Sequence, residues 1–551
     1  MVAEQDQKLV DYPVIVSIDF GTTFSGCCYA LQSSDNDEIY DITRWPKNNG
    51  FYAKTPTLLY YRNKNNKLLD WGRGARLQSL RPDQSGTLLQ YFKLALVQPD
   101  DVPLPEGKSP IDVISDFLRV FHEHVCEQLQ KTTLLQDFRQ EHYQYCLTVP
   151  AIWSDESKAI MREASIKAGI IEHDDPIHRL ELISEPEAAA AYCEYKYKSW
   201  NLSNGNTFMI VDAGGGTVDL ITYLIEDVTP PRTLREVTRG HGGMCGSAFI
   251  DQNMRKLLKS KLTGEMPVCM FEMMMDNFIQ FVKPNYLGDE ECYKLDVPAG
   301  ALPYIPMHLL DDGDLMVFSL QELRDEVFNP VLKQVVELVE QQISQAGAFV
   351  DAIFLVGGFG CSSYLYDILK INFSHQVGEI AMPPSGELAI ARGAAAYIKK
   401  PNLVTSKVLR RTYGVQTRLP FEEGLDPEDS AIITKDGIKR CSTRFDVIAK
   451  KGQRISIDQK IKRSYWIEYP KHTEADLYVT DQDDSPRQIT DSSVIKLAEI
   501  PIKMPLLSHI EPGTRMDVTI EFSFGSTEIK MLIYLADTVS EHVLDTIDSF
   551  T

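Results

Sequence analysis

The 551-residue sequence lacks several features that would place it in a common protein class. Its ten cysteines are scattered without a repeated CxxC spacing, which argues against a zinc site or a disulfide framework and favours an intracellular protein with reduced thiols. No apolar run is long enough to span a membrane, and Met1–Val10 has no apolar signal core. We therefore expect no membrane span and a location in the cytoplasm or the nucleus.

Positive charge is also scarce. The sequence has 56 lysines and arginines against 78 acidic residues, so its net charge is −22. Nucleic acids and anionic membranes bind to clustered positive charge, and we therefore expect neither as a partner. The hydrophobic content of 43% is ordinary for a globular protein, and the length allows roughly two to four domains.

Neither a P-loop nor a complete G-x-G-x-x-G motif occurs, but the stretch Thr207–Leu220 predicts another kind of phosphate site. An apolar run typical of a buried strand ends in Asp212. Glycines that let the backbone turn sharply follow it, and their N–H groups can bind an anion together with the Thr217 hydroxyl: Gly214, Gly215 and Gly216. A tight hairpin with a solvated aspartate would show the same pattern, so one such turn does not decide between the two interpretations.

A second copy of the pattern favours the phosphate site. The stretch Val16–Tyr29 is again an apolar run with an acid, a glycine and two threonines, namely Asp19, Gly21, Thr22 and Thr23. The repeat indicates two lobes that each offer a phosphate loop to one nucleotide. Acids beside a phosphate would repel it unless a divalent cation lies between them, which predicts Mg²⁺ held by Asp19 and Asp212 largely through water.

Two further glycine-rich turns are candidate ligand contacts. Gly242 and Gly243 lie in Arg239–Phe249, which precedes a predicted helix and is a candidate anion contact. Gly357 and Gly358 end a predicted buried strand, and their lack of side chains leaves room for a flat ring such as adenine.

Glu185 stands immediately before Pro186, at the expected start of a helix. A carboxylate fixed there by a rigid turn can position an attacking water. A plain acid at the start of a helix would need no function, and the residues alone leave both interpretations open.

The C-terminal part has a different pattern. From about Lys407 the chain alternates β-branched segments with charged or glycine- and proline-containing turns, which predicts an antiparallel β-domain. Asp537–Phe550 is the one candidate helix there, and a short one. Before Lys407 we expect helices over Leu68–Leu80 and Leu320–Ile343.

An ordered set of motifs resembles the ATPase domain of the 70-kDa heat-shock protein family. The motifs follow one another in the family's order over roughly residues 12–400, with spacing closest to the divergent type-12-like branch: DFGTT (19–23), LTVPAIWSDESK (147–158), ISEPEAAAAY (183–192), VDAGGGTVDL (211–220), HGGMCGS (241–247) and FLVGGFG (354–360). The resemblance implies an α/β, actin-like ATPase fold with two ribonuclease H-like lobes, at 12–206 and 207–400, followed by a small β-rich domain at 407–551.

The resemblance also assigns roles to residues. It implies ATP and ADP as ligands with Mg²⁺, Thr22 and Thr23 at the β- and γ-phosphates, and Gly357 and Gly358 at the adenosine. By position it implies a catalytic set of Lys93, Glu185, Asp212 and Thr217. A cation on the γ-phosphate and a carboxylate that aligns water would stabilise the transition state.

Departures from the family pattern concern the adenosine and the C-terminal part. Where the family has a Glu-x-x-Lys-Arg clamp on adenosine, the chain has Gln280–Pro284 and keeps only Lys283, and the stacked arginine becomes Cys361. Because an arginine stacks well on a ring, we expect weaker or faster-exchanging nucleotide. The acidic interdomain linker is missing from Lys399–Lys407, and the helical lid is absent, which argues against ordinary peptide chaperoning.

Three functions follow as hypotheses. The first is a divergent chaperone-like ATPase that couples hydrolysis of ATP to a protein client or regulatory partner. The second is a small-molecule kinase of the same superfamily, which the EPEAAA setting of Glu185 argues against. The third is a nucleotide-binding scaffold that hydrolyses little, which the altered adenosine clamp suggests.

Overall fold

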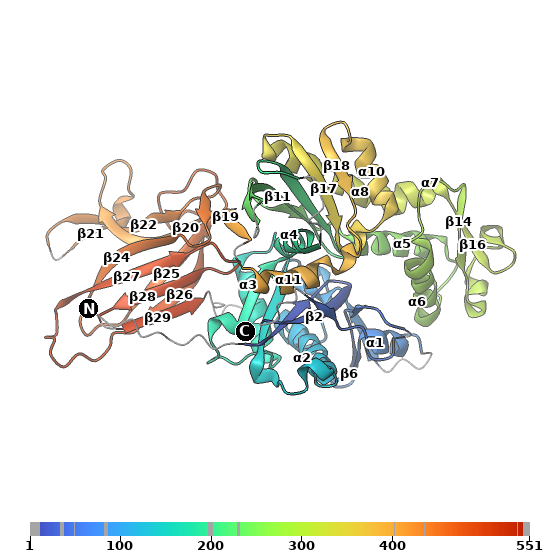
Figure 1. The fold of residues 1–551 in the computed structure, drawn as a ribbon, viewed down its shortest axis with the longest axis horizontal. Coiled ribbons are helices and arrows are strands. Elements are labelled where there is room, and N and C mark those ends of the chain that lie inside the picture. Colours follow the sequence, from blue (N-terminus) through green and yellow to red (C-terminus); the bar gives the residue numbers. More distant parts are fainter. Residues whose placement is uncertain are drawn as a thin grey trace. The chain divides into compact units, whose positions relative to one another are not determined.

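The computed structural model describes residues 12–32, 38–48, 50–81, 86–196, 202–228, 232–401, 403–434, 436–536 and 538–543. The fold is mixed α/β with several sheets (Figure 1). Contacts among the described residues divide the chain into two compact units. The first comprises Met1–Trp153, Ala164–Arg232 and His241–Leu403, and the second comprises Ser154–Glu163, Thr233–Gly240 and Val404–Thr551.

The first sheet of the larger unit contains the first predicted phosphate turn. Its strand order is β3-β2-β1-β8-β9, with β4 paired to β2. β1 and β2 form an antiparallel hairpin, and β8 and β9 extend the sheet in parallel from β1. The strands are β1 (Val14–Asp19), β2 (Phe24–Leu31), β3 (Tyr40–Asp41), β4 (Lys54–Pro56), β8 (Tyr143–Val149) and β9 (Leu180–Ser184). Every residue of β1 is buried, as its apolar sequence predicts.

The second sheet of this unit repeats the pattern. β10 and β11 form an antiparallel hairpin, and β17 and β18 extend the sheet in parallel from β10. The order β11-β10-β17-β18 therefore matches β2-β1-β8-β9 strand for strand. The strands are β10 (Thr207–Ala213), β11 (Val218–Asp227), β17 (Val350–Val356) and β18 (Val377–Ala381), with β13 (His241–Gly243) paired to β11.

Each sheet is followed by a helix, and the two helices pack against each other (Figure 1). α4 (Glu185–Lys196) follows β9, and α11 (Ala389–Lys399) follows β18. Their backbones are so close at Gly393 that a Cβ atom there would lie 1.7 Å from the carbonyl oxygen of Ala188. Only glycine fits at this crossing.

The remaining elements of the larger unit surround these sheets. Strands β5, β6 and β7 form a small sheet in the order β6-β5-β7, and β14, β15 and β16 form another in the order β14-β16-β15. These strands are β5 (Leu58–Arg62), β6 (Leu68–Trp71), β7 (Gly86–Gln90), β14 (Cys292–Asp296), β15 (Leu310–Asp311) and β16 (Leu315–Ser319). The helices are α1 (Gly72–Ser79), α2 (Pro110–Gln130), α5 (Ser247–Lys261), α6 (Val268–Asn277), α8 (Asn329–Ala346), α9 (Gly357–Gly360) and α10 (Ser363–Phe373).

Two helix predictions needed correction in their bounds. The helix expected over Leu68–Leu80 begins only at Gly72, because Leu68–Trp71 pair with β5 as strand β6. The helix expected over Leu320–Ile343 is present, but it is built from α7 (Leu320–Glu322), a π-helical segment Leu323–Phe328 and α8.

The second unit contains mainly antiparallel strands. One sheet has the order β21-β22-β20-β25-β26 and another the order β24-β27-β28-β29, and both contribute to one apolar core that includes Val479 and Ile520. The strands are β20 (Thr412–Pro420), β21 (Ala431–Ile433), β22 (Lys439–Ala449), β24 (Lys460–Glu468), β25 (Thr473–Thr480), β26 (Val494–Ile502), β27 (Arg515–Ser523), β28 (Lys530–Leu535) and β29 (Thr538–Val543). β12 (Thr233–Glu236), β19 (Val404–Val408) and β23 (Arg454–Ser456) pair with one another in that order. α3 (Asp155–Lys167) begins in this unit and ends in the larger one.

The prediction of a helix over Asp537–Phe550 is wrong for the residues of this segment that the structure describes. Thr538–Val543 form strand β29, paired antiparallel to β28. The edge of β28 provides backbone hydrogen-bond partners for this segment along the whole register from Lys530↔Val543 to Leu535↔Thr538. Residues 537 and 544–550 of this prediction lie outside the described residues.

Candidate functional site

A cavity of about 400 Å³ lies in the larger unit, at the ends of β1, β10 and β17. It brings together most residues that the sequence predicted for a nucleotide site, although they come from widely separated segments. The predicted residues among its lining are Asp19, Gly21, Thr22, Thr23, Lys93, Glu185, Asp212, Gly214, Gly215, Gly216, Thr217, Lys283, Gly357 and Gly358. Asp19 and Asp212 therefore face the same cavity.

The two glycine turns lie directly against each other. A Cβ atom on Gly215 would lie 2.3 Å from Oγ1 of Thr23, and one on Gly216 would lie 2.5 Å from Oγ1 of Thr22. The glycines are thus needed for the close approach of the two turns, and the threonine hydroxyls lie where these turns meet the cavity.

The third glycine-rich turn supports the second one, and it reaches the cavity through Ser247 and not through its glycines. The amides of Gly246, Ser247 and Ala248, at the start of α5, donate to the carbonyl oxygens of the Gly214–Gly216 turn over 2.8 to 3.1 Å. These N–H groups are therefore used within the protein. Gly242 and Gly243, predicted as anion contacts, lie on β13 paired with β11, and they are not among the lining residues.

Lys93 and Glu185 form a buried ion pair in the cavity wall. Nζ of Lys93 lies 2.8 Å from Oε1 of Glu185, and the side chains are 3% and 10% exposed. The ammonium also lies 5.0 Å from the centre of the Trp153 ring and 5.6 Å from that of Phe20. Burial raises the pKa of Glu185 to about 7, although Lys93 opposes the shift and the nearby carboxylates of Asp219 and Asp19 add to it.

The acidic end of the cavity has the charge that a divalent cation requires. Burial raises the pKa of Asp212 well above its usual value, and the carboxylates of Glu185, Asp219 and Asp19 raise it further. Asp219, in the next strand, accepts a hydrogen bond from the amide of Ile152 at 3.0 Å. Carboxylates that raise one another's pKa repel one another when they are ionised, and a bound cation reduces this repulsion. These residues therefore fit the predicted magnesium site.

The turn after β17 has an open glycine surface. Gly357 has a φ of +82°, and a Cβ atom there would lie 2.4 Å from the carbonyl oxygen of Ala213. At Gly358, by contrast, a Cβ atom would meet nothing within 4 Å, so the backbone is bare toward the cavity. Cys361 lines the same region, with its Sγ 3.7 Å from Oε2 of Glu387.

Lys283 also reaches the cavity. Its ammonium donates to Oδ1 of Asp251 at 2.7 Å and to the carbonyl oxygen of Ser247 at 2.9 Å. Both partners belong to α5, whose first residues hold the second glycine turn. Lys283 therefore connects the Gln280–Pro284 segment to α5 and, through the start of α5, to the second glycine turn.

Lys54 is the principal lining residue that the sequence did not single out. Its Nζ lies 2.7 Å from Oδ2 of Asp19. The adjoining Thr57 holds this segment on the first glycine turn, since its amide donates to Thr23 and its hydroxyl to Gly21, each over 2.8 Å. Two other charged lining residues, Asp251 and Glu387, were also missed. The place of Lys54 beside Asp19 depends on the pairing of β4 with β2, which the sequence does not reveal.

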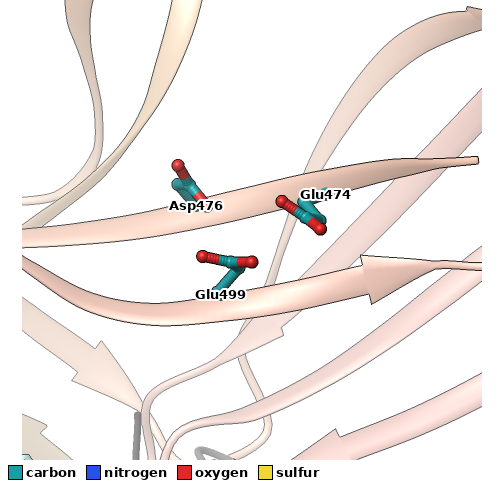
Figure 2. Close-up of side chains that lie close together, drawn as sticks. All are labelled: Glu474, Asp476 and Glu499. Atoms are coloured by element: carbon teal, nitrogen blue, oxygen red, sulfur yellow. The ribbon is translucent and has the colours of Figure 1, made fainter. Parts of the chain in front are cut away.

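A second acidic group lies in the other unit. Figure 2 shows Glu474 and Asp476 of β25 beside Glu499 of β26. Their carboxylate oxygens lie within 4.8 Å of one another. Nζ of Lys496 lies 3.0 Å from Asp476 and 2.6 Å from Glu499, so two of the three carboxylates already pair with an ammonium.

Comparison with known proteins agrees with the motifs. The chain is 24% identical to human heat shock 70 kDa protein 12B over 94% of this chain and 89% of that protein. It is 25% identical to human heat shock 70 kDa protein 12A over 96% and 90% of the two chains. The chain resembles the type-12 branch of the 70-kDa heat-shock proteins. The resemblance predicted from the motifs is thus confirmed.

The wider family matches over a shorter region. Chaperone protein DnaK of Buchnera aphidicola is 22% identical over 62% of this chain and 53% of that protein. No family model matches the chain. Taken together, the relatives indicate a nucleotide-binding protein like the 70-kDa heat-shock proteins.

Among the described residues, no helix is both long and apolar enough to cross a membrane.

Proposed function

We propose that the chain is a divergent ATPase that binds Mg-ATP between two lobes of an actin-like fold and hydrolyses it to ADP. The observation that carries this proposal is the contact between the two glycine turns, with Asp19 and Asp212 lining one cavity. The repeated strand order of the two sheets supports the assignment of lobes at 12–206 and 207–400. The antiparallel strands after Val404 support a separate β-rich domain at 407–551.

Each part of the cavity has a role in this mechanism. The threonines of the first turn and the amides of the second bind the phosphates, and the bare backbone at Gly358 accommodates the adenine. Asp19 and Asp212 hold Mg²⁺ through water, and the metal supplies charge neutralisation of the phosphates. Lys93 stabilises the charge that develops on the γ-phosphate. Glu185, once ionised, aligns the attacking water, and Lys93 favours that ionised form.

We also propose that nucleotide state is coupled to a protein partner, in the cytoplasm. The relatives are named heat shock proteins or chaperones, which supports a protein client or regulatory partner. The ten free cysteines support a reducing compartment.

Calorimetry with ATP and ADP, with and without Mg²⁺, tests the binding. We expect measurable affinity that increases with Mg²⁺ and that decreases in Asp19→Asn and Asp212→Asn. Undetectable binding of both nucleotides to the correctly folded wild type would refute the proposal.

A nucleotide-binding scaffold is the second candidate, because Cys361 lines the cavity and stands where the family has a stacking arginine. Steady-state ATPase rates of wild type, Lys93→Ala and Glu185→Ala separate the two. An ATPase loses activity in both variants, whereas equal background rates in all three would identify a scaffold. If the chain instead transfers the phosphate of ATP to a sugar hydroxyl in a panel of sugars, and not to water, the result would support the small-molecule kinase hypothesis.

A further inference from the structure

Lys54 places a fixed ammonium at the acidic end of the cavity. Its Nζ lies 2.7 Å from Oδ2 of Asp19, and the two side chains are 10% and 5% exposed. β4 pairs with β2 so that Lys54 lies opposite Gly26, and a Cβ atom on Gly26 would lie 3.0 Å from Cγ of Lys54. The stem of the lysine therefore packs over a bare glycine, and this close packing fixes the position of its charge.

The other lysines of the cavity wall are each engaged with an acid elsewhere. Of the described residues that line the cavity, five are acids and three are lysines. Lys93 pairs with Glu185 and Lys283 with Asp251. Lys54 is the lysine that lies against an aspartate of the predicted magnesium site.

The Lys54 charge also acts on the second acid of that site. Asp212 lines the same cavity as Asp19 and Lys54. A single buried ammonium thus lies 2.7 Å from one proposed magnesium ligand and shares the cavity with the other, where it supplies positive charge as Mg²⁺ would in the proposed function.

We propose that Lys54 is a built-in counter-ion of the nucleotide site, which makes the binding of ATP less dependent on Mg²⁺ than these acids alone would allow. The inference rests on the proposed function. In the absence of Mg²⁺, the ammonium reduces the repulsion between the aspartates and the phosphates and attracts the phosphates directly. In the presence of Mg²⁺, it repels the metal and decreases the benefit that the metal brings. Both effects reduce the same ratio, the Kd for ATP in EDTA divided by the Kd for ATP in Mg²⁺.

The purely structural alternative predicts a different result. If Lys54 only attached β4 to β1, its loss would change the affinity for ATP by the same factor with and without Mg²⁺. Lys54→Gln tests this, because it keeps a hydrogen-bond donor of similar reach and removes the charge. Lys54→Met removes both, and Lys54→Arg keeps the charge.

The experiment is calorimetric titration of the full chain with ATP in excess Mg²⁺ and in EDTA. We expect the ratio of the two Kd values to rise at least tenfold in Lys54→Gln and Lys54→Met, and to stay within threefold of wild type in Lys54→Arg. Arg392→Met is the matched control, because Arg392 forms an ion pair with Asp41 and is not among the lining residues. We expect its ratio to equal that of wild type.

Thermal unfolding of each variant identifies any that do not fold, and Lys54→Gln, which keeps a hydrogen-bond donor, then carries the test. An unchanged ratio in a folded Lys54→Gln protein would overturn the inference and leave the proposed function intact. Absence of ATP binding by wild type in both conditions would overturn the proposed function and this inference with it.

Discussion

The ammonium of Lys93 lies 2.8 Å from a carboxylate oxygen of Glu185, and both side chains are buried in the wall of the cavity that the two glycine turns share. The residues are 92 positions apart in the sequence. Their pairing explains how a lysine and a glutamate can both be buried: each satisfies the charge of the other, and the remaining surface of both faces the cavity.

Substitution of this pair should separate hydrolysis from binding. We expect Lys93→Met and Glu185→Gln each to reduce the ATPase rate by about 10²–10³, because each removes a group that acts mainly in the transition state. The Kd for ATP should change by less than about tenfold, since neither residue holds the nucleotide alone. Single-turnover hydrolysis together with equilibrium binding measures both quantities. Equal losses in rate and affinity would assign the pair to ground-state binding instead.

The raised pKa of Glu185 predicts a pH dependence of stability. The pKa is about 7 in the folded protein against an ordinary value of 4.5, so between these pH values the folded state holds a proton that the unfolded state has lost. The contribution of Glu185 to the free energy of unfolding is fully present below about pH 4.5 and is lost as the pH rises to about 7. Urea unfolding of the nucleotide-free protein from pH 5 to 7.5 should show a decline that is smaller in Glu185→Gln. Parallel curves for the two proteins would contradict the prediction.

The two glycines at the end of β17 should respond differently to alanine. Gly357→Ala should lower the melting temperature, because φ is +82° there and the new Cβ would lie 2.4 Å from a carbonyl oxygen. Gly358→Ala should leave the melting temperature unchanged, because its Cβ would meet no protein atom within 4 Å. It should instead weaken the binding of ATP roughly tenfold, since the methyl group projects into the proposed adenine position. Differential scanning fluorimetry and calorimetry distinguish the two effects, and unaltered ATP affinity in Gly358→Ala would place the adenine elsewhere.

An ion-pair network connects α1 to α6 across the two proposed lobes. Arg76 donates to Asp276 at 2.8 Å and to Glu272 at 2.7 Å, and Arg255 also donates to Glu272. We expect Arg76→Ala to speed the dissociation of nucleotide by about tenfold or more, because the lobes lose charge-assisted hydrogen bonds that hold them closed.

Stopped-flow release of a fluorescent nucleotide measures this rate. Arg119→Ala is the control, because Arg119 is 42% exposed and forms its ion pairs within α2. A release rate in Arg76→Ala equal to that of the control would show that the network does not restrain opening.

The parts of the site that lie at strand ends were predictable from the sequence. Asp19 and Asp212 each follow an apolar run, and the glycines follow at once, so the local pattern locates both turns. Lys54 was not predictable, because its place beside Asp19 depends on the pairing of β4 with β2.

Local patterns also have limits where hydrogen bonds decide the role of a segment. The glycine-rich turn before α5 suggested an anion contact, but its amides at Gly246–Ala248 donate to backbone carbonyl oxygens of the second phosphate turn. The sequence pattern of a turn that binds a ligand and of a turn that supports one is the same. At the C-terminus, strand β29 depends on the edge of β28, which a short segment does not reveal by itself.

The crossing of α4 and α11 at Gly393 restricts how the two sheets can shift during a nucleotide cycle. With the helix backbones already in contact at Ala188, translation by one turn along the helix axes would bring Ala389 or Tyr397, which share the face of Gly393, into a gap that admits only hydrogen. Rotation about this point changes few contacts. If the proposed lobes move against each other, we therefore expect this crossing to be the pivot, so that a small rotation here gives a larger displacement at residues far from it.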